Sequence, residues 1–176
     1  MKKKVVILVV AHEGYQPIEY GIPYELLKNA GVAVMTGSNK PGIATAKDFS
    51  STTVDVTLEQ INPALCDGIF LIGGPGALEA LDVPLMHTLL QQIKALGKLY
   101  GAICISSRIL AHANVLGGRK ATGWNEDQKL EEIFKKYAVT YVPEPVVVDH
   151  NVITAVGPQA AQFFGKALLK ALNYAS

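Results

Sequence analysis

The fold is decided by the stretch KLYGAICISSRILAHA, residues 98–113, in which an apolar strand runs without a linker into a helix. Ile109, Leu110 and Ala113 follow at spacings of three and four residues, which is typical of the buried face of a helix. Cys104 lies at the joint. A side chain at such a turn projects from the top of the sheet, beside the free N–H groups of the helix N-terminus. The stretch therefore predicts a reactive cysteine.

The helix N-terminus should also set the ionisation of Cys104. It carries about half a positive charge, so we expect it to lower the pKa of the thiol from about 8.5 toward neutrality. Small Gly101 and Ala102 leave the approach uncrowded. The alternative is a buried cysteine that packs as a small hydrophobic residue.

Composition excludes several classes of function. Of the 176 residues, 49% are hydrophobic and 18% charged, which is typical of a compact soluble protein. The formal net charge of +1 offers no basic surface, so we expect no nucleic-acid partner. The apolar run Val5 to Ala11 is too short for a membrane span or a signal peptide. We therefore expect a cytoplasmic protein without membrane contact, in which Cys66 and Cys104 stay free thiols.

Strands alternate with helices along the rest of the chain. Residues 4–11 and 67–72 are continuous apolar runs, typical of strands buried on both faces of a parallel sheet, and the first is expected at its centre. The pattern predicts a hairpin over residues 146–155 and helices near residues 17–31, 77–81, 85–96, 126–137 and 157–173. This alternation predicts one domain over residues 1–176, with a flavodoxin-like three-layer α/β/α sandwich around a mostly parallel sheet.

Three loops should meet at the carboxyl edge of this sheet. They are residues 12–19, residues 73–76 and the turn at Cys104. Ligands of open α/β sheets bind at that edge, so a site is expected there.

The loop Gly73-Gly74-Pro75-Gly76 matches neither a dinucleotide fingerprint nor a Walker loop. One interpretation is geometric: a glycine N–H directed at the cysteine could join the N–H of Ile105 as a two-donor oxyanion hole. The other is a tight turn with no chemical role. The local sequence favours neither.

Glu19 also has two interpretations. A carboxylate in the first turn of a helix can simply stabilise the helix dipole. If its loop meets Cys104, however, a thiolate and a carboxylate cannot lie in contact unpaired. A protonated Glu19 that donates to the thiolate is then the stable arrangement.

These residues resemble the ThiJ/PfpI family, which includes the parkinsonism-associated protein deglycase and belongs to the class I glutamine amidotransferase-like superfamily. The resemblance covers nearly the whole chain. It depends on these motifs: Glu19 within Ile-Glu-Tyr-Gly-Ile-Pro, Gly73-Gly74 after a strand, Ala102-Ile103-Cys104, and Ile153-Thr154 with Gly157-Pro158 before the last helix.

The resemblance implies roles for individual residues. Cys104 would be the nucleophile, Glu19 its protonated partner, and Gly74 with Ile105 the oxyanion donors. Lys47 would occupy a position where relatives carry an anion-binding arginine. The resemblance also implies a homodimer.

The sequence departs from the family at the general base. Protease-like members carry histidine directly after the nucleophile, where this chain has Ile105, and deglycase-like members carry it some twenty residues later, at the position of Trp124. Of the remaining histidines, only His12 leaves a strand on the expected catalytic edge. It is therefore the possible replacement base, the alternative being a solvated loop residue.

Three functions follow from this pattern. The first is a cysteine-dependent enzyme acting on small reactive carbonyls or their adducts by deglycase-like or glyoxalase-like hydrolysis, with no cofactor and no metal. The second is a non-catalytic stress protein whose Cys104 is a redox sensor. The third is an intracellular amidase or peptidase, which the absence of histidine at position 105 disfavours.

Overall fold

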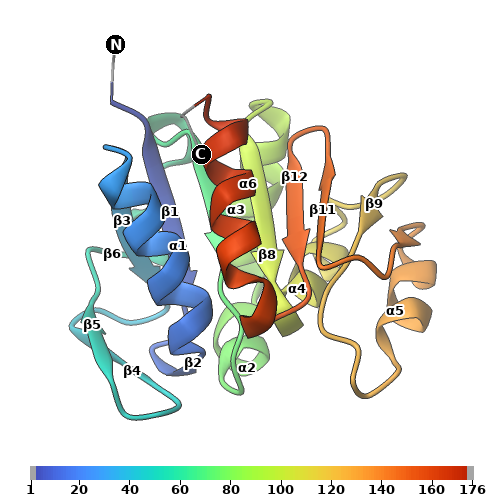
Figure 1. Ribbon diagram of the computed structural model, residues 1–176, viewed down its shortest axis with the longest axis horizontal. Helices are drawn as coiled ribbons and strands as arrows, with labels where there is room; N and C mark the ends of the chain where they lie inside the picture. Colours follow the sequence, from blue (N-terminus) through green and yellow to red (C-terminus); the bar gives the residue numbers. More distant parts are fainter. Residues whose placement is uncertain (1–2, 174–176) are drawn as a thin grey trace.

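A seven-stranded sheet forms the middle layer of the computed structural model (Figure 1). The structure describes residues 3–173, so residues 1–2 and 174–176 of the predicted domain lie outside it. The strand order is β11-β12-β8-β7-β1-β3-β6, and every neighbouring pair is parallel except β11 with β12. The strands are β1 (Val5–Val10), β3 (Ala33–Ser38), β6 (Val56–Thr57), β7 (Gly68–Leu71), β8 (Leu99–Ile103), β11 (Val146–Asp149) and β12 (Val152–Ala155).

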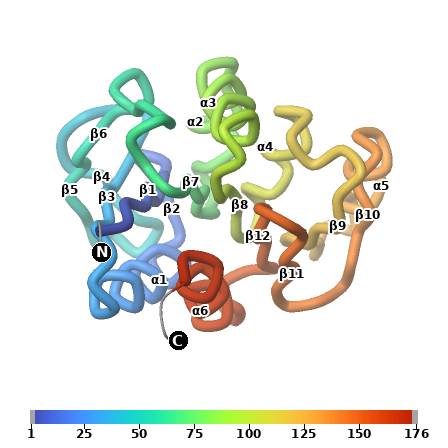
Figure 2. The backbone as a smooth tube through the Cα atoms, turned by 90° about the horizontal axis from the view of Figure 1, so that it is seen from above, coloured from blue at the N-terminus to red at the C-terminus, as the bar shows by residue number. Residues whose placement is uncertain are grey.

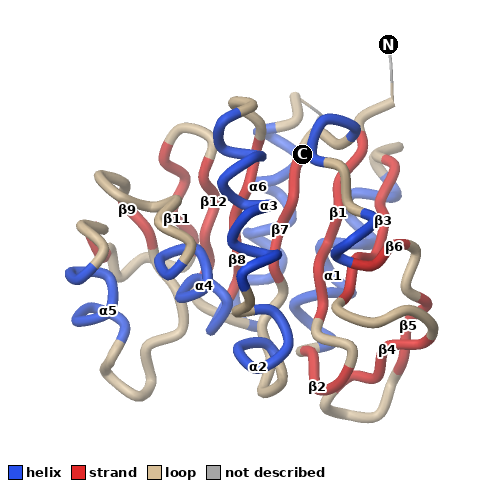
Figure 3. Tube along the Cα trace, turned by 180° about the vertical axis from the view of Figure 1, so that it is seen from behind, coloured by secondary structure: helices blue, strands red, loops and turns tan. Residues whose placement is uncertain are grey.

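Alternation of side chains along each strand produces two cores. In β1, Ile7 and Val9 pack into one core, whereas Val6 and Leu8 pack into the other, because successive residues point to opposite faces. Helices cover both faces, as Figure 2 shows from above. On one face lie α1 (Pro17–Asn29) and α6 (Ala161–Ala171), and on the other, seen in Figure 3, lie α2 (Ala77–Leu81), α3 (Pro84–Ala95), α4 (Ser107–His112) and α5 (Leu130–Lys136). The predicted three-layer α/β/α sandwich is confirmed.

The middle strand of the sheet is β7, not β1 as expected. Both strands are buried on both faces, and β1 lies between β7 and β3. Apolar runs report burial but not strand order, so the sequence could not distinguish the two.

Short elements flank the main sheet. A three-stranded sheet consists of β2 (Glu13–Tyr15), β4 (Ile43–Ala46) and β5 (Ser51–Thr53), with β4 paired to both of the others. A second small pair is β9 (Lys120–Ala121) with β10 (Thr140–Tyr141). No helix of the described part of the chain is long and apolar enough to cross a bilayer.

The helix expected from residue 126 begins four residues later, at Leu130. Its N-cap residue is Lys129, and the Oδ1 of Asn125, five residues before the helix, accepts the N–H of Leu130 at 2.8 Å. The residues between form a loop because Gln128 takes a positive φ of 58° and Asp127 is drawn toward α4 by an ion pair with Arg108. Residues 124–129, here called the rim loop, consequently lie beside the cysteine turn.

Backbone hydrogen bonds join the predicted loops at the carboxyl edge of the sheet. The N–H of Gln16 donates to the carbonyl of Gly73 at 2.9 Å, and that of Gly76 to Gly14 at 3.2 Å. The N–H of Trp124 donates to the carbonyl of Cys104 at 3.1 Å. The expected convergence is thus present, and the rim loop joins it.

Candidate active site

Cys104 lies in a strained turn between β8 and α4. Its φ is 66°, the left-handed region that costs a residue other than glycine about 1–3 kcal/mol. Ser107 holds this conformation because its Oγ donates to the carbonyl of Cys104 at 2.7 Å, and the N–H of Trp124 donates to the same oxygen. The strain directs the thiol to the edge of the sheet, as expected from the sequence.

Glu19, in the first turn of α1, lies against the cysteine. Its side chain is fully buried, and its Oε2 accepts the N–H of Gly73 at 2.9 Å. Its Oε1 is buried without a nitrogen or oxygen partner, and the polar group with which the carboxyl shares a hydrogen bond is the Cys104 thiol. The buried Glu19 and the partly buried Cys104 therefore form a pair. Together with Gly73 they are here called the floor.

Only glycine allows this contact at position 73. A Cβ atom there would lie 2.6 Å from both the Cβ of Cys104 and Oε2 of Glu19, closer than real Cβ contacts. Glycine is therefore required at this position by the close packing of Cys104 and Glu19, and not only by the turn.

Burial changes the ionisation of both members of the pair. It raises the pKa of Glu19 from 4.5 to about 7, against the lowering effects of Cys104, the Gly73 N–H and Lys47. Burial and then the neighbouring carboxylate raise the pKa of Cys104 from 9.0 to about 12. Between about pH 7 and 12 the pair accordingly keeps a single proton, shared between the thiol and the carboxyl.

The expected lowering of the Cys104 pKa by the helix N-terminus is therefore wrong. The cause is that α4 is only six residues long, and burial beside an acid outweighs its dipole. The thiolate becomes accessible only as the proton moves onto Glu19.

Two backbone N–H groups face the sulfur, those of Ile105 and Gly74, and both lower the pKa of Cys104. Gly74 has a φ of 123°, and a Cβ there would lie 2.6 Å from the N of Gln16, so the loop requires glycine. The residues predicted as oxyanion donors are brought together, and their role in a reaction stays a prediction.

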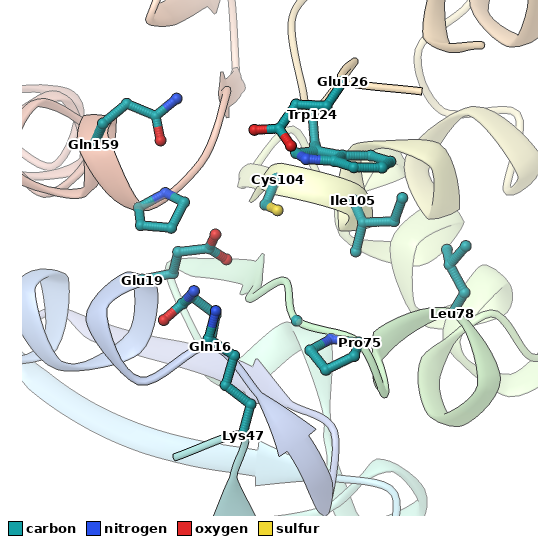
Figure 4. Close-up of a pocket in the computed structure, with 12 residues that line it drawn as sticks. Gln16, Glu19, Lys47, Pro75, Leu78, Cys104, Ile105, Trp124, Glu126 and Gln159 are labelled. Carbon is teal, nitrogen blue, oxygen red and sulfur yellow. The ribbon is translucent and has the colours of Figure 1, made fainter. Parts of the chain in front are cut away.

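An open cavity of about 470 Å³ lies above the floor, within the size range of small-ligand sites (Figure 4). Its lining combines polar and apolar side chains. The residues are Gln16, Glu19, Lys47, Gly74, Pro75, Leu78, Cys104, Ile105, Trp124, Glu126, Pro158 and Gln159.

The structure treats the two further predicted residues differently. Lys47 lines the cavity with an exposed side chain and lowers the pKa of Glu19 through its charge. His12 does not line it: its Nε2 lies 3.1 Å from the carbonyl oxygen of Pro41. His12 directly precedes β2, and its carbonyl accepts the N–H of Thr45 in β4 at 2.8 Å, so the residue is held at the flanking sheet and not at the cavity.

Sequence reasoning missed Glu126 and Gln16, which also line the cavity. Gln16 is buried and caps α1, its Oε1 accepting the N–H of Ile18 at 3.4 Å. Glu126 was placed in a helix that in fact begins later. Its position two residues after the missing histidine of the family pattern was the signal that could have found it.

Comparison with known proteins assigns the chain to a family. The family model described as DJ-1/PfpI family matches residues 3–171. The chain belongs to the DJ-1/PfpI family. The ThiJ/PfpI resemblance seen in the sequence is confirmed.

Relatives of this family match the chain along most of its length. An uncharacterized protein of Methanocaldococcus jannaschii is 33% identical over 174 residues, covering 98% of this chain and 84% of its own. Deglycase PH1704 of Pyrococcus horikoshii is 28% identical over 168 residues, covering 96% and 99%. The crystal structure of a ThiJ/PfpI domain protein from Brachyspira murdochii shares the fold, with a TM-score of 0.92, 24% identity and 98% coverage of each chain.

Proposed function

We propose that the protein is a cysteine-dependent enzyme that acts on small reactive carbonyls or their adducts, in the manner of a deglycase or glyoxalase. The observation that carries this proposal is the Cys104–Glu19 pair beneath an open cavity, with the N–H groups of Gly74 and Ile105 on the sulfur. The archaeal relatives named deglycase, at 28% identity, support it.

The pair supplies the first step of such a reaction. As the sulfur attacks a carbonyl carbon, the thiol proton moves to Glu19, whose pKa of about 7 suits proton transfer at neutral pH. The carbonyl oxygen takes the negative charge and then the proton, giving a hemithioacetal. With a 2-oxoaldehyde, a proton moves from the first to the second carbon and the hydroxyl proton moves from the first oxygen to the second, which converts this adduct to a thioester of a 2-hydroxy acid on Cys104. Water then releases a 2-hydroxy acid and the thiol.

Lys47 would contribute to binding. Its exposed amine lies on the cavity wall across from the rim loop (Figure 4). We propose that it attracts an anionic group of the substrate, in the place of the arginine that the family resemblance implies.

Consumption of methylglyoxal by wild type, Cys104→Ala and Cys66→Ala tests the proposal. Cys66 is the second free cysteine and is buried away from the cavity, so its variant is the matched thiol control. We expect turnover in wild type and in Cys66→Ala, and none in Cys104→Ala. Turnover that persists without Cys104, or none in wild type, would overturn the proposal.

A redox sensor is the second candidate, and one observation favours it. The positions expected for a catalytic histidine carry Ile105 and Trp124, both on the cavity wall. In that function mild peroxide adds two oxygen atoms to Cys104, and Glu19 donates to the sulfinate. Intact-mass analysis should then find the gain in wild type and not in Glu19→Leu. An amidase or peptidase ranks third, because Ile105 cannot act as a base.

The predicted homodimer and cytoplasmic location remain proposals. Exposed apolar Ile18 on α1 and Phe163 on α6 support association of two copies through this face. Light scattering after size exclusion tests the mass, and a monomer at micromolar concentration would refute the dimer. The free thiols are consistent with a reducing compartment.

A further inference from the structure

The cavity holds a second carboxylate, which no role assigned so far uses. Among the described residues that line it, the groups able to exchange a proton are Cys104, Glu19, Lys47 and Glu126. Glu126 is exposed and lies with Trp124 on the side of the cavity opposite Glu19, with Cys104 between them (Figure 4). The sulfur is thus flanked by a buried acid and a solvated one.

The two acids have different access to water. Glu19 is fully buried, and its Oε2 is packed so closely against Gly73 that not even a Cβ atom has room there. Glu19 therefore has no exposed surface on which to hold a water molecule from solvent. Glu126 faces the open part of the cavity, where water has access.

Arg108 holds the rim loop on both sides of Glu126. Asp127 forms an ion pair with Arg108 at 2.6 Å, and the guanidinium of the same arginine lies over the ring of Trp124, 5.4 Å from its centroid. Arg108 is 6% exposed and belongs to α4, the helix that follows Cys104. Asp127, directly after Glu126, and Trp124, two residues before it, are therefore both held against the cysteine helix by Arg108.

We propose that Glu126 is a catalytic residue, the general base that activates water to hydrolyse the acyl intermediate on Cys104, in place of the missing histidine. This inference rests on the proposed function. Glu126 accepts one proton from a water molecule while the water oxygen forms a bond to the thioester carbonyl carbon. The carbon–sulfur bond then breaks, and the sulfur leaves with its electron pair. The proton returns to the Cys104–Glu19 pair, and the carboxylic acid is released.

Glu126→Gln tests this division of labour, with Glu79→Gln as the matched control. Glu79 is an exposed carboxylate of α2, outside the cavity lining. We expect methylglyoxal turnover to fall about 100-fold or more in Glu126→Gln, the usual contribution of a general base, and to stay unchanged in Glu79→Gln. Alkylation of Cys104 by iodoacetamide should proceed at the wild-type rate in both.

The decisive readout is the trapped intermediate. Acid-quenched Glu126→Gln should carry one methylglyoxal-derived acyl group on Cys104, stable to denaturation and released by hydroxylamine, whereas wild type should carry little. Wild-type turnover in Glu126→Gln, or reduced turnover without the acyl group, would overturn the inference while leaving the proposed function intact. Absence of turnover in wild type would instead refute both.

Discussion

The floor and the rim of the cavity differ in how the fold makes them. The floor consists of Cys104, Glu19 and Gly73, which lie at or near the ends of β8, α1 and β7 and are packed closely against one another. The rim consists of Lys47, Trp124 and Glu126, which lie on loops and are partly or fully exposed. In this account the floor carries the group that forms the covalent bond, and the rim affects substrate binding and product release. Changes in the floor should therefore have large effects, and changes in the rim smaller and more selective ones.

The largest effect should come from crowding the floor. Gly73→Ala places a methyl group 2.6 Å from the Cβ of Cys104 and from Glu19, so the pair must separate. We expect loss of methylglyoxal turnover and a destabilisation of about 1–3 kcal/mol in urea unfolding. Gly117→Ala is the control, because a Cβ there meets only the carbonyl of Tyr137 at 3.7 Å. Equal activity in the two variants would show that the floor tolerates movement.

A second test measures the cost of burying Glu19. Its pKa is raised from 4.5 to about 7, so between these values the folded state holds a proton that the unfolded chain has lost. The free energy of unfolding should therefore decrease by about 3 kcal/mol as the pH rises through this range, at about 1.4 kcal/mol for each pKa unit. Glu19→Gln should abolish that decrease and be more stable than wild type at pH 8. If the free energies of unfolding of the two proteins had the same pH dependence, the raised pKa of Glu19 would be contradicted.

The smallest effect is expected at the rim. Lys47 is exposed and only attracts the substrate, so Lys47→Gln should raise KM a few-fold for substrates with an anionic group and leave kcat unchanged. Lys40→Gln, on an exposed lysine outside the cavity lining, is the charge-matched control. A large loss of kcat in Lys47→Gln would show that Lys47 takes part in the chemical step and does not only bind substrate.

The same distinction explains what the sequence could predict. Continuous apolar runs and the abrupt strand-to-helix joint at Cys104 predict a buried sheet and a sharp turn at the cysteine, and the structure has both. The meeting of the loops that carry Glu19 and Gly74 was predictable because parallel strands bring their carboxyl ends to one edge, whereas the roles of these residues came from the family resemblance. The floor was accessible to sequence reasoning because burial leaves a pattern.

The rim was not accessible in this way. Glu126 reaches the cavity because Arg108 pairs with Asp127 across 19 residues, and no local pattern encodes that ion pair. The pKa of Cys104 was predicted in the wrong direction because the helix dipole is a local property, whereas burial beside Glu19 depends on the whole fold. His12 was predicted near the site because it follows a strand at the expected edge, but its side chain hydrogen-bonds the carbonyl oxygen of Pro41 instead.

The central claim is that Cys104 and Glu19 share one proton, and the pH dependence of Cys104 alkylation tests it most directly. The rate constant for iodoacetamide is measured in a Cys66→Ala background, with Glu19 present or replaced by Gln. With Glu19 the rate should stay low above pH 7 and rise only toward about pH 12, because the ionised carboxylate keeps the remaining proton of the pair on the thiol. In Glu19→Gln, which lacks the carboxylate that raises the pKa of Cys104, the rise should move to lower pH and the reaction at pH 9 should be at least tenfold faster. Identical profiles in the two proteins would contradict the shared proton.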